Sequence, residues 1–197
     1  MKWVGRMQPG IAIVGLWIGW GVSWAIAAFW SNRTEARPGI GTELRFRIPM
    51  AIGALLMLVP AHGSKGVLRL WHVGWTGAWV CVALAALGIG FAWWARVYLG
   101  QLWSAHITRK ADHRVVDSGP YGIVRHPIYS GLLLSLLATC AAKGTVFGVG
   151  GFAFLLLGTW MKARLEEQWL ARELGEGAYA DYRKRVPMLM PFGPKGG

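Results

Sequence analysis

Two long segments of this sequence contain no charged residue, and they limit what the chain can fold into. Residues 7–32 and residues 70–94 lack Asp, Glu, Lys and Arg altogether. At about 1.5 Å of rise per residue, about 20 helical residues cross the roughly 30 Å hydrocarbon layer of a membrane. With 54% hydrophobic and only 15% charged residues over 197 positions, the chain is also too apolar for an ordinary soluble domain. Both segments therefore predict membrane-spanning helices.

Three shorter apolar segments predict further membrane helices. Residues 48–61 carry no charge. Arg45 and Arg47, just before them, have side chains long enough to place their charged groups at the membrane interface. Residues 127–142 and 144–161 are separated by Lys143 alone, which favours a tight helical hairpin. The predicted fold is an all-α membrane protein with about five transmembrane helices, of which the last two form a tight hairpin.

Neither the N-terminal apolar run nor the cysteines predict a secreted, disulfide-bonded protein. A cleaved signal peptide is the alternative for the N-terminus, but the run from Gly10 to Trp30 exceeds the usual apolar core of about 7–15 residues, and no small-x-small cleavage pattern follows it. We therefore expect a retained helix. Cys81 and Cys140 both lie inside apolar runs and are expected to be buried thiols, without a disulfide or a metal site.

The distribution of charge predicts the orientation of the chain in the membrane. With five spans, sixteen of the twenty-one Lys and Arg residues fall on one side, together with all nine acidic residues. The positive-inside rule places that side in the cytoplasm, so the N-terminus is expected outside and the C-terminus inside. The net charge of +12 is then explained by topology and contact with anionic lipid, and nucleic acid is not a predicted partner. The thirteen Trp residues are typical of an interfacial aromatic belt.

Polar residues gather in two segments that flank the predicted hairpin. In the first, the turn signal Gly119-Pro120 predicts that residues 106–126 form a cytoplasmic loop. Pro127 suits the first turn of the helix that follows. In the second, apolar residues recur at helical spacing, which predicts a cytoplasmic amphipathic helix continuing from the fifth span; they are Leu165, Trp169, Leu170 and Leu174.

The hairpin is expected to bring acidic residues of the second segment beside the start of the fourth helix. Glu166 and Glu167 lie where the fifth span leaves the membrane, and His126 and Tyr129 lie where the fourth begins. Ionisable groups at this depth are candidates for function.

The order of these residues resembles the isoprenylcysteine carboxyl methyltransferase family and its prokaryotic relatives. The resemblance covers roughly the C-terminal half of the chain, while the N-terminal spans match only in being apolar. The pattern is Gly119-x-Tyr121-x-x-x-Arg125-His126-Pro127-x-Tyr129-x-Gly131, then Glu166-Glu167-x-x-Leu170, Gly175, Tyr179-x-x-Tyr182 and Val186-Pro187.

The resemblance implies a site for S-adenosyl-L-methionine that is built without a Rossmann fold. No G-x-G-x-x-G loop follows a predicted strand, which also argues against a soluble type of cofactor domain. By the family's pattern the cofactor contacts His113, Arg114, Val115, Val116, Tyr121, His126, Pro127, Ile128 and Tyr129, with His106 as a further upstream candidate. One of the paired acids, Glu166 or Glu167, completes this set, and the pattern leaves open which one.

The residues assigned to the reaction are Arg125, His126, Tyr129, Lys162, Arg164, Glu166 and Glu167. The sequence departs from the family's pattern in two places. Lys162 occupies the position of the family's substrate-side arginine, with Arg164 two residues further on and on a different helix face. There is also one extra residue between Gly175 and Tyr179. These departures concern the identity of the substrate and the alignment of the C-terminal residues with the family's pattern, and they affect the cofactor site less.

The resemblance divides the chain into residues 1–99, with three spans, and residues 100–197, which carry the catalytic half. The expected function is an integral membrane methyltransferase acting on a lipophilic acceptor, such as the carboxylate of a prenylated cysteine or a related small substrate. A carboxylate acceptor needs no general base, whereas an amine or thiol would need one, and His126 or a glutamate is available for that.

The alternatives to this expected function are an NADPH-dependent membrane reductase of the sterol-reductase kind, a phospholipid or thiol methyltransferase, and a non-catalytic membrane scaffold. The bilayer and a lipophilic or lipidated substrate are the expected partners, and the sequence predicts no oligomeric state.

Overall fold

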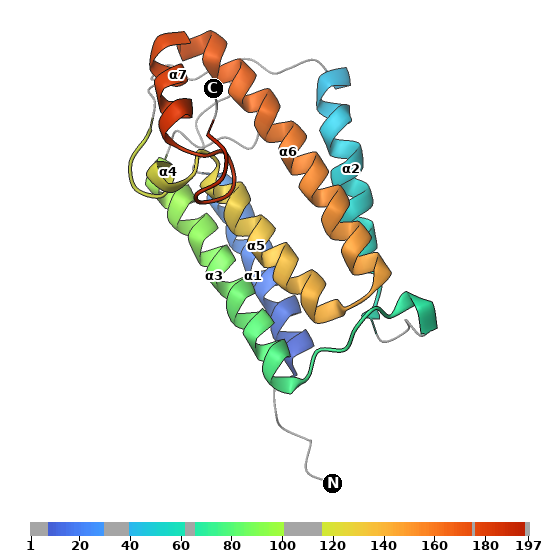
Figure 1. Ribbon diagram of the computed structural model, residues 1–197. Coiled ribbons are helices and arrows are strands. Elements are labelled where there is room, and N and C mark those ends of the chain that lie inside the picture. The colour runs from blue at the N-terminus through green and yellow to red at the C-terminus, as the bar shows by residue number, and fades with distance from the viewer. Residues whose placement is uncertain (1–7, 30–39, 62–65, 101–115, 175, 196–197) are drawn as a thin grey trace.

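The computed structural model describes residues 8–29, 40–61, 66–100, 116–174 and 176–195, and the regular secondary-structure elements within these ranges are all helices. No β-strand occurs in the described residues, and isolated bridges join only Arg69 to Thr145 and Pro187 to Lys195. The predicted all-α class is confirmed. The helices, shown in Figure 1, are α1 (Pro9–Ala28), α2 (Ile40–Leu58), the short 3₁₀ turn η2 (Gly66–Leu68), α3 (Trp75–Leu99), α4 (Pro120–Ile123), α5 (Pro127–Lys143), α6 (Val146–Leu174) and α7 (Glu176–Arg185).

Three of these helices are long and apolar enough to cross a membrane, so the chain is an integral membrane protein. They are α1, α3 and the segment Val146–Arg172 of α6. Helix α5 is apolar but has only 17 residues, and α2 has 19 residues with Glu43, Arg45 and Arg47 in its first half. Helices therefore occupy all five predicted places, and three of them meet the requirements of a span by themselves.

Two helix boundaries differ from the sequence prediction. Helix α2 begins at Ile40, eight residues before the apolar run, because an acidic residue suits the first turn of a helix and Glu43 pairs with Arg47 at 2.5 Å one turn later. Helix α3 begins at Trp75 and not at residue 70. The backbone N–H groups of Leu70 and Trp71 instead donate to the carbonyl of Gly144, which ties this segment to the α5–α6 connection.

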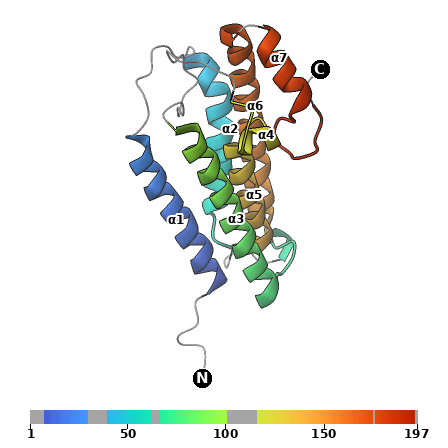
Figure 2. The ribbon, with the colours of Figure 1, turned by 90° about the vertical axis from the view of Figure 1, so that its left-hand side faces the viewer.

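The predicted hairpin of α5 and α6 is tight only at its turn. Gly144 adopts the left-handed conformation that ends α5, and α6 begins at Val146. Beyond the turn, however, α5 packs mainly against α3, and α6 packs mainly against α2, as Figure 1 shows. Helix α1 lies on the outer side of α3, which is clearest in Figure 2. The tight turn of the predicted hairpin is therefore present, whereas close packing along its length is not, because each of its two helices packs mainly on an earlier helix.

Glycines are the reason that these two helix pairs match. Where α3 crosses α5, a Cβ atom added to Gly88 would collide with the Gly131 carbonyl and the Ser135 hydroxyl. Where α2 crosses α6, a Cβ atom added to Gly53 would lie 2.7 Å from the Gly151 carbonyl oxygen. Such small-residue contacts let helix backbones approach closely in membranes, where packing and not hydrophobic burial drives association. The Ser135 hydroxyl adds a buried hydrogen bond of 2.9 Å to the Ala85 carbonyl across the α3–α5 contact.

The close approach of α3 and α5 predicts that Gly88→Ala destabilises the protein. The added methyl group has no space at Gly88, and overpacking of this kind costs about 1–3 kcal/mol. We expect a lower midpoint of thermal unfolding in detergent. The matched control is Gly90→Ala on the same helix, where nothing lies within 4 Å of the added atom; it should keep or slightly raise the midpoint, and equal midpoints for both variants would contradict this account of the packing.

Candidate functional site

The start of α5 is held in place by the C-terminal segment of the chain. After the short helix α4, Val124 is extended and His126 precedes the first residue of α5, Pro127. The backbone N–H groups of Arg125 and His126 donate to the carbonyls of Pro187 and Met188, at 2.8 and 3.1 Å. The backbone that carries these two side chains is therefore held by the C-terminal segment, and α5 begins at Pro127 as predicted.

A buried ion pair between Arg125 and Glu167 connects α5 to α6. The Arg125 Nε atom lies 2.6 Å from Glu167 Oε1, and the two side chains are only 3% and 5% exposed. The Nη1 atom of the same guanidinium donates to the carbonyls of Arg183 and Val186. A charge at such a depth is tolerated only when it is paired and hydrogen-bonded. The pair therefore fixes the positions of three chain segments relative to one another.

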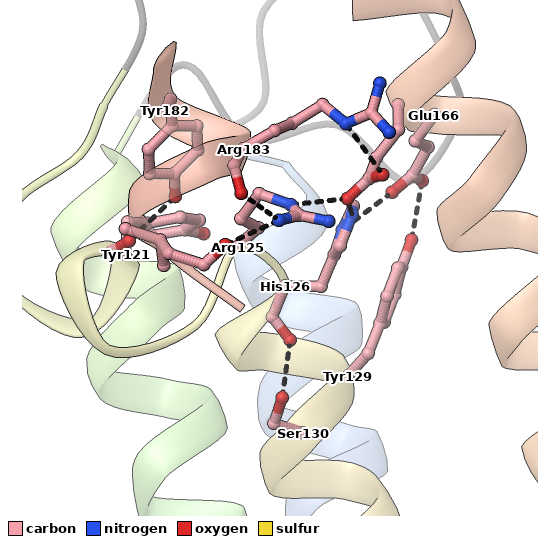
Figure 3. Close-up of polar contacts among 10 residues, drawn as sticks. Tyr121, Arg125, His126, Tyr129, Ser130, Glu166, Tyr182 and Arg183 are labelled. Carbon is pink, nitrogen blue, oxygen red and sulfur yellow. Dashed lines mark hydrogen bonds and ion pairs between the residues drawn. The ribbon is translucent and has the colours of Figure 1, made fainter. Parts of the chain in front are cut away.

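The second acid, Glu166, receives a hydrogen bond from Tyr129. The Tyr129 hydroxyl donates to Glu166 Oε1 at 2.6 Å, as Figure 3 shows. The other carboxylate oxygen lies 3.5 Å from His126 Nδ1, and Lys162 Nζ lies 3.9 Å from Oε1. The Lys162 ammonium also lies 5.3 Å from the ring centroid of Tyr129 and 6.0 Å from that of Phe46 on α2. Glu166 is thus the centre of a small network that includes a cation and two aromatic rings.

His126 lies between the two acids. Its ring stacks on that of Tyr129, with centroids 5.5 Å apart and planes inclined by 11°. Its Nε2 atom lies 3.4 Å from Glu167 Oε1 without completing a hydrogen bond among the described residues. Burial by itself lowers the pKa of His126, but the carboxylates of Glu166 and Glu167 beside its two ring nitrogens outweigh burial and raise this pKa above its ordinary value. The imidazole is therefore stabilised in its protonated form.

Three tyrosines of α4 and α7 are buried near this network. Tyr182 on α7 donates a hydrogen bond of 2.7 Å to the carbonyl of Tyr121 on α4, and Tyr179 and Tyr182 are buried with Val186. Burial is the main cause that raises the pKa of all three phenols, so they remain neutral hydrogen-bond donors. The Tyr121 hydroxyl is directed at the Ala95 carbonyl on α3, at 3.5 Å. Tyr121 therefore supports the site from the α3 side.

The structure brings together six of the seven residues assigned to the reaction. Arg125, His126, Tyr129, Lys162, Glu166 and Glu167 form one connected network, whereas Arg164 is exposed and its guanidinium lies 5.2 Å from the ring centroid of Trp160. This agrees with the prediction that Lys162 and Arg164 point to different faces of α6. Of the other predicted cofactor residues, Pro127 is fully buried, Ile128 and Val116 are half-buried, and His106, His113, Arg114 and Val115 lie outside the described residues.

Sequence reasoning missed the part that the C-terminal segment plays in the site. Arg183 Nε lies 3.8 Å from Glu167 Oε2, and backbone carbonyls of residues 183–189 accept the hydrogen bonds of Arg125, His126 and Ser130. The Val186-Pro187 pair is part of the resemblance pattern, but a carbonyl acceptor leaves no signal in the identity of its side chain. Cys81 and Cys140 are buried, as expected. In the described part of the chain, no group of three or more His, Cys, Asp or Glu side chains could hold a metal ion.

Comparison with known proteins agrees with this arrangement. The model of the isoprenylcysteine carboxyl methyltransferase (ICMT) family matches residues 80–171, which include α5 and both glutamates. The chain is a relative of this family. It is 36% identical over 105 residues to a protein-S-isoprenylcysteine O-methyltransferase of Schizosaccharomyces pombe, covering 51% of this chain and 43% of the relative.

Other proteins similar to this chain carry different names. Methanethiol S-methyltransferase 2 of Bradyrhizobium diazoefficiens is 42% identical over 73 residues, which cover 36% of this chain and 26% of that protein. A cobalt-zinc-cadmium resistance protein of Cupriavidus metallidurans is 35% identical over 123 residues, covering 61% of this chain and 55% of the relative. The chain thus spans about half or less of the length of these relatives.

The protonated state of His126 predicts a pH dependence of stability. A pKa that is higher in the folded than in the unfolded chain contributes stability that is complete below the unfolded value, about 6.5, and is lost as the pH rises through the folded value. We expect the unfolding midpoint to fall as the pH is raised above 6.5, and His126→Gln to remove this slope. His72→Gln alters an exposed histidine before α3 and should leave the slope unchanged; a slope that persists in His126→Gln would show that His126 does not cause it.

Proposed function

We propose that this chain is an integral membrane methyltransferase that uses S-adenosyl-L-methionine. The observation that carries the proposal is the network in which His126 and Tyr129, at the start of α5, meet both Glu166 and Glu167 of α6. The relationship to a family of methyltransferases supports it, since the matched region contains this network. The same relationship argues against the two alternatives, an NADPH-dependent reductase and a scaffold without catalytic activity.

The described residues fit a cationic, hydroxyl-rich cofactor. S-adenosyl-L-methionine, when bound, supplies a methyl group on a positively charged sulfur. Glu166 keeps 19% of its side chain exposed, and its carboxylate can accept hydrogen bonds from ribose hydroxyl or amino groups. The His126 Nε2 atom is buried and makes no hydrogen bond among the described residues, so a donor remains for a ligand atom. The ring of Tyr129 and the negative charge of Glu166 both favour a cation close by.

The site's own residues act by positioning and electrostatics. The ion pair of Arg125 with Glu167 and the Tyr129–Glu166 hydrogen bond hold the acids before a ligand arrives, and alignment of two reactants is worth several kcal/mol of barrier. The raised pKa of His126 favours the protonated form of its ring, and only the neutral form can act as a base. This favours an acceptor that needs no base, such as a carboxylate, over a neutral amine.

The proposed acceptor is a lipophilic molecule with an anionic group, for example the carboxylate of a prenylated cysteine; a thiol is the alternative. Lys162 supports an anionic acceptor, since its ammonium lies between the Tyr129 and Phe46 rings at the edge of the network and its side chain is 16% exposed. A lipophilic acceptor would arrive laterally from the bilayer. We further propose five membrane crossings, with α2 and α5 as the shorter ones, the N-terminus outside, and the site on the cytoplasmic side, following the charge distribution.

Binding of the cofactor tests the proposed class. We expect the detergent-purified protein to bind S-adenosyl-L-methionine in calorimetric titration and not NADPH. Glu166→Gln should weaken binding at least about tenfold, which corresponds to about 1.4 kcal/mol, because the variant loses the negative charge that faces the cofactor. The control, Gln168→Glu, alters an exposed neighbour on α6 and should bind as the parent does. Binding of NADPH alone would move the assignment to a reductase, and binding of neither by folded protein would favour a scaffold.

Lys162 is expected to matter for the acceptor more than for the cofactor. With a carboxylate acceptor, Lys162→Met should raise KM for the acceptor by about tenfold or more while leaving cofactor affinity nearly unchanged, because one charge-assisted hydrogen bond contributes about 1.5–3 kcal/mol. Arg164→Met removes a cation two residues away that lies against Trp160 and should have little effect. Equal effects of the two substitutions would contradict a local role for Lys162, and unchanged kinetics in Lys162→Met would favour a neutral acceptor.

A further inference from the structure

The chain returns from the end of α7 to the start of α5 and there forms an exposed apolar turn. Figures 1 and 2 both show the segment after α7 running back to the region where α5 begins. The Ser130 hydroxyl, in the first turn of α5, donates to the carbonyl of Leu189. A turn follows at once, closed by a hydrogen bond of 2.9 Å from the Gly193 N–H to the Met190 carbonyl. We call residues 190–193 the tail turn.

The tail turn presents large apolar side chains away from the protein. Phe192 is fully exposed, at 103% of its reference area, and Met190 is 70% exposed. Phe192 also has a φ angle of 63°, the left-handed conformation that a bulky residue seldom adopts. Removing such a side chain from water is favourable. An apolar tip held outward on a tight turn therefore calls for an apolar partner.

The position of the tail turn identifies that partner as the membrane. Ser130 lies one turn before the exposed apolar positions of α5, which include Leu134 and Leu137. The tail turn begins one residue after the hydrogen-bonded Leu189, so it lies at the boundary between the apolar part of the bundle and the polar end that holds the site.

Charge near the tail turn fits the same partner. The exposed Lys195 follows the turn. Lys184 and Arg185 at the end of α7 are also exposed, although they pair with Asp181 and Asp117 at 3.8 and 2.9 Å. Basic residues beside an apolar tip are the combination that binds the headgroup boundary of a membrane containing anionic lipid. A second protein as the partner would need a larger matching surface than a single turn offers, because specific interfaces bury about 1,200 Å² or more.

We propose that the tail turn inserts Met190 and Phe192 into the headgroup boundary on the side of the membrane where the site lies. The attachment holds the preceding residues, whose carbonyls bind the backbone of Arg125 and His126 and the hydroxyl of Ser130. The membrane surface thereby stabilises the segment that positions the site. This inference rests on the chain being a membrane protein and is independent of the methyl transfer.

Depth-dependent fluorescence quenching tests the proposal. Phe192→Cys and, separately, Met190→Cys are labelled with an environment-sensitive fluorophore, and the protein is placed in nanodiscs of phosphatidylcholine and phosphatidylglycerol. We expect blue-shifted emission that loses about half or more of its intensity when the lipids carry a nitroxide near the headgroup. Aqueous iodide should quench it weakly. The unaltered chain, treated alike, sets the background from the buried Cys81 and Cys140.

The matched control is Asp181→Cys on α7, where the acidic side chain is 75% exposed. Its label should behave in the opposite way, with strong quenching by iodide and little by nitroxide lipids. The proposal is overturned if the labels at Phe192→Cys and Met190→Cys respond as the control does. Both substitutions lie at exposed positions outside the site, so the measurement remains valid whether or not the protein binds S-adenosyl-L-methionine.

Discussion

The buried ion pair of Arg125 and Glu167 joins parts of the chain that are far apart in the sequence. Arg125 stands just before α5, Glu167 lies in the last third of α6, and the carbonyls that share the guanidinium belong to the end of α7. Breaking such a pair by removing one partner generally costs about 3–5 kcal/mol, since the remaining charge stays buried without compensation. Replacing both partners by apolar groups can be nearly neutral. The pair therefore contributes mainly by fixing which segments meet, and less by adding net stability.

The helix pairs of the bundle place this ion pair at one end of the molecule. Helix α5 follows α3 and helix α6 follows α2, with glycines at both crossings. The opposite end is closed by cations that bind carbonyls: Arg69 donates to Ala61 and Lys143, and the Lys143 ammonium donates to Val59. One end of the bundle is thus sealed by backbone acceptors, while the other holds the carboxylates. Among the described residues, the buried carboxylates therefore lie at the second end.

The sequence predicted the helical class and the composition of the site better than the packing of the helices. The Arg125-His126-Pro127 start of a helix, the continuation of α6 past the apolar run, and the meeting of Glu166 with Tyr129 all follow from local patterns. The pairing of α5 with α3 did not follow from the sequence, because it depends on the close approach of Gly88 on α3 to Gly131 on α5. The apolar periodicity of a helix does not indicate which other helix it packs against. The role of the C-terminal segment was also missed, since it acts through carbonyls that every residue possesses.

The two glutamates have unequal surroundings, and this suggests unequal roles. Glu167 is 5% exposed, and its carboxylate lies within ion-pair distance of Arg125, His126 and Arg183. Its oxygens are therefore occupied by interactions within the protein. Glu166 is 19% exposed, and its only hydrogen bond from a described side chain at ordinary length comes from Tyr129, with His126 and Lys162 at 3.5 and 3.9 Å. Weakly held oxygens can exchange partners when a ligand arrives, whereas those of a buried bifurcated ion pair cannot do so without exposing a charge. For the two acids that the sequence could not distinguish, this difference supports the proposal that Glu166 meets the cofactor and that Glu167 positions His126.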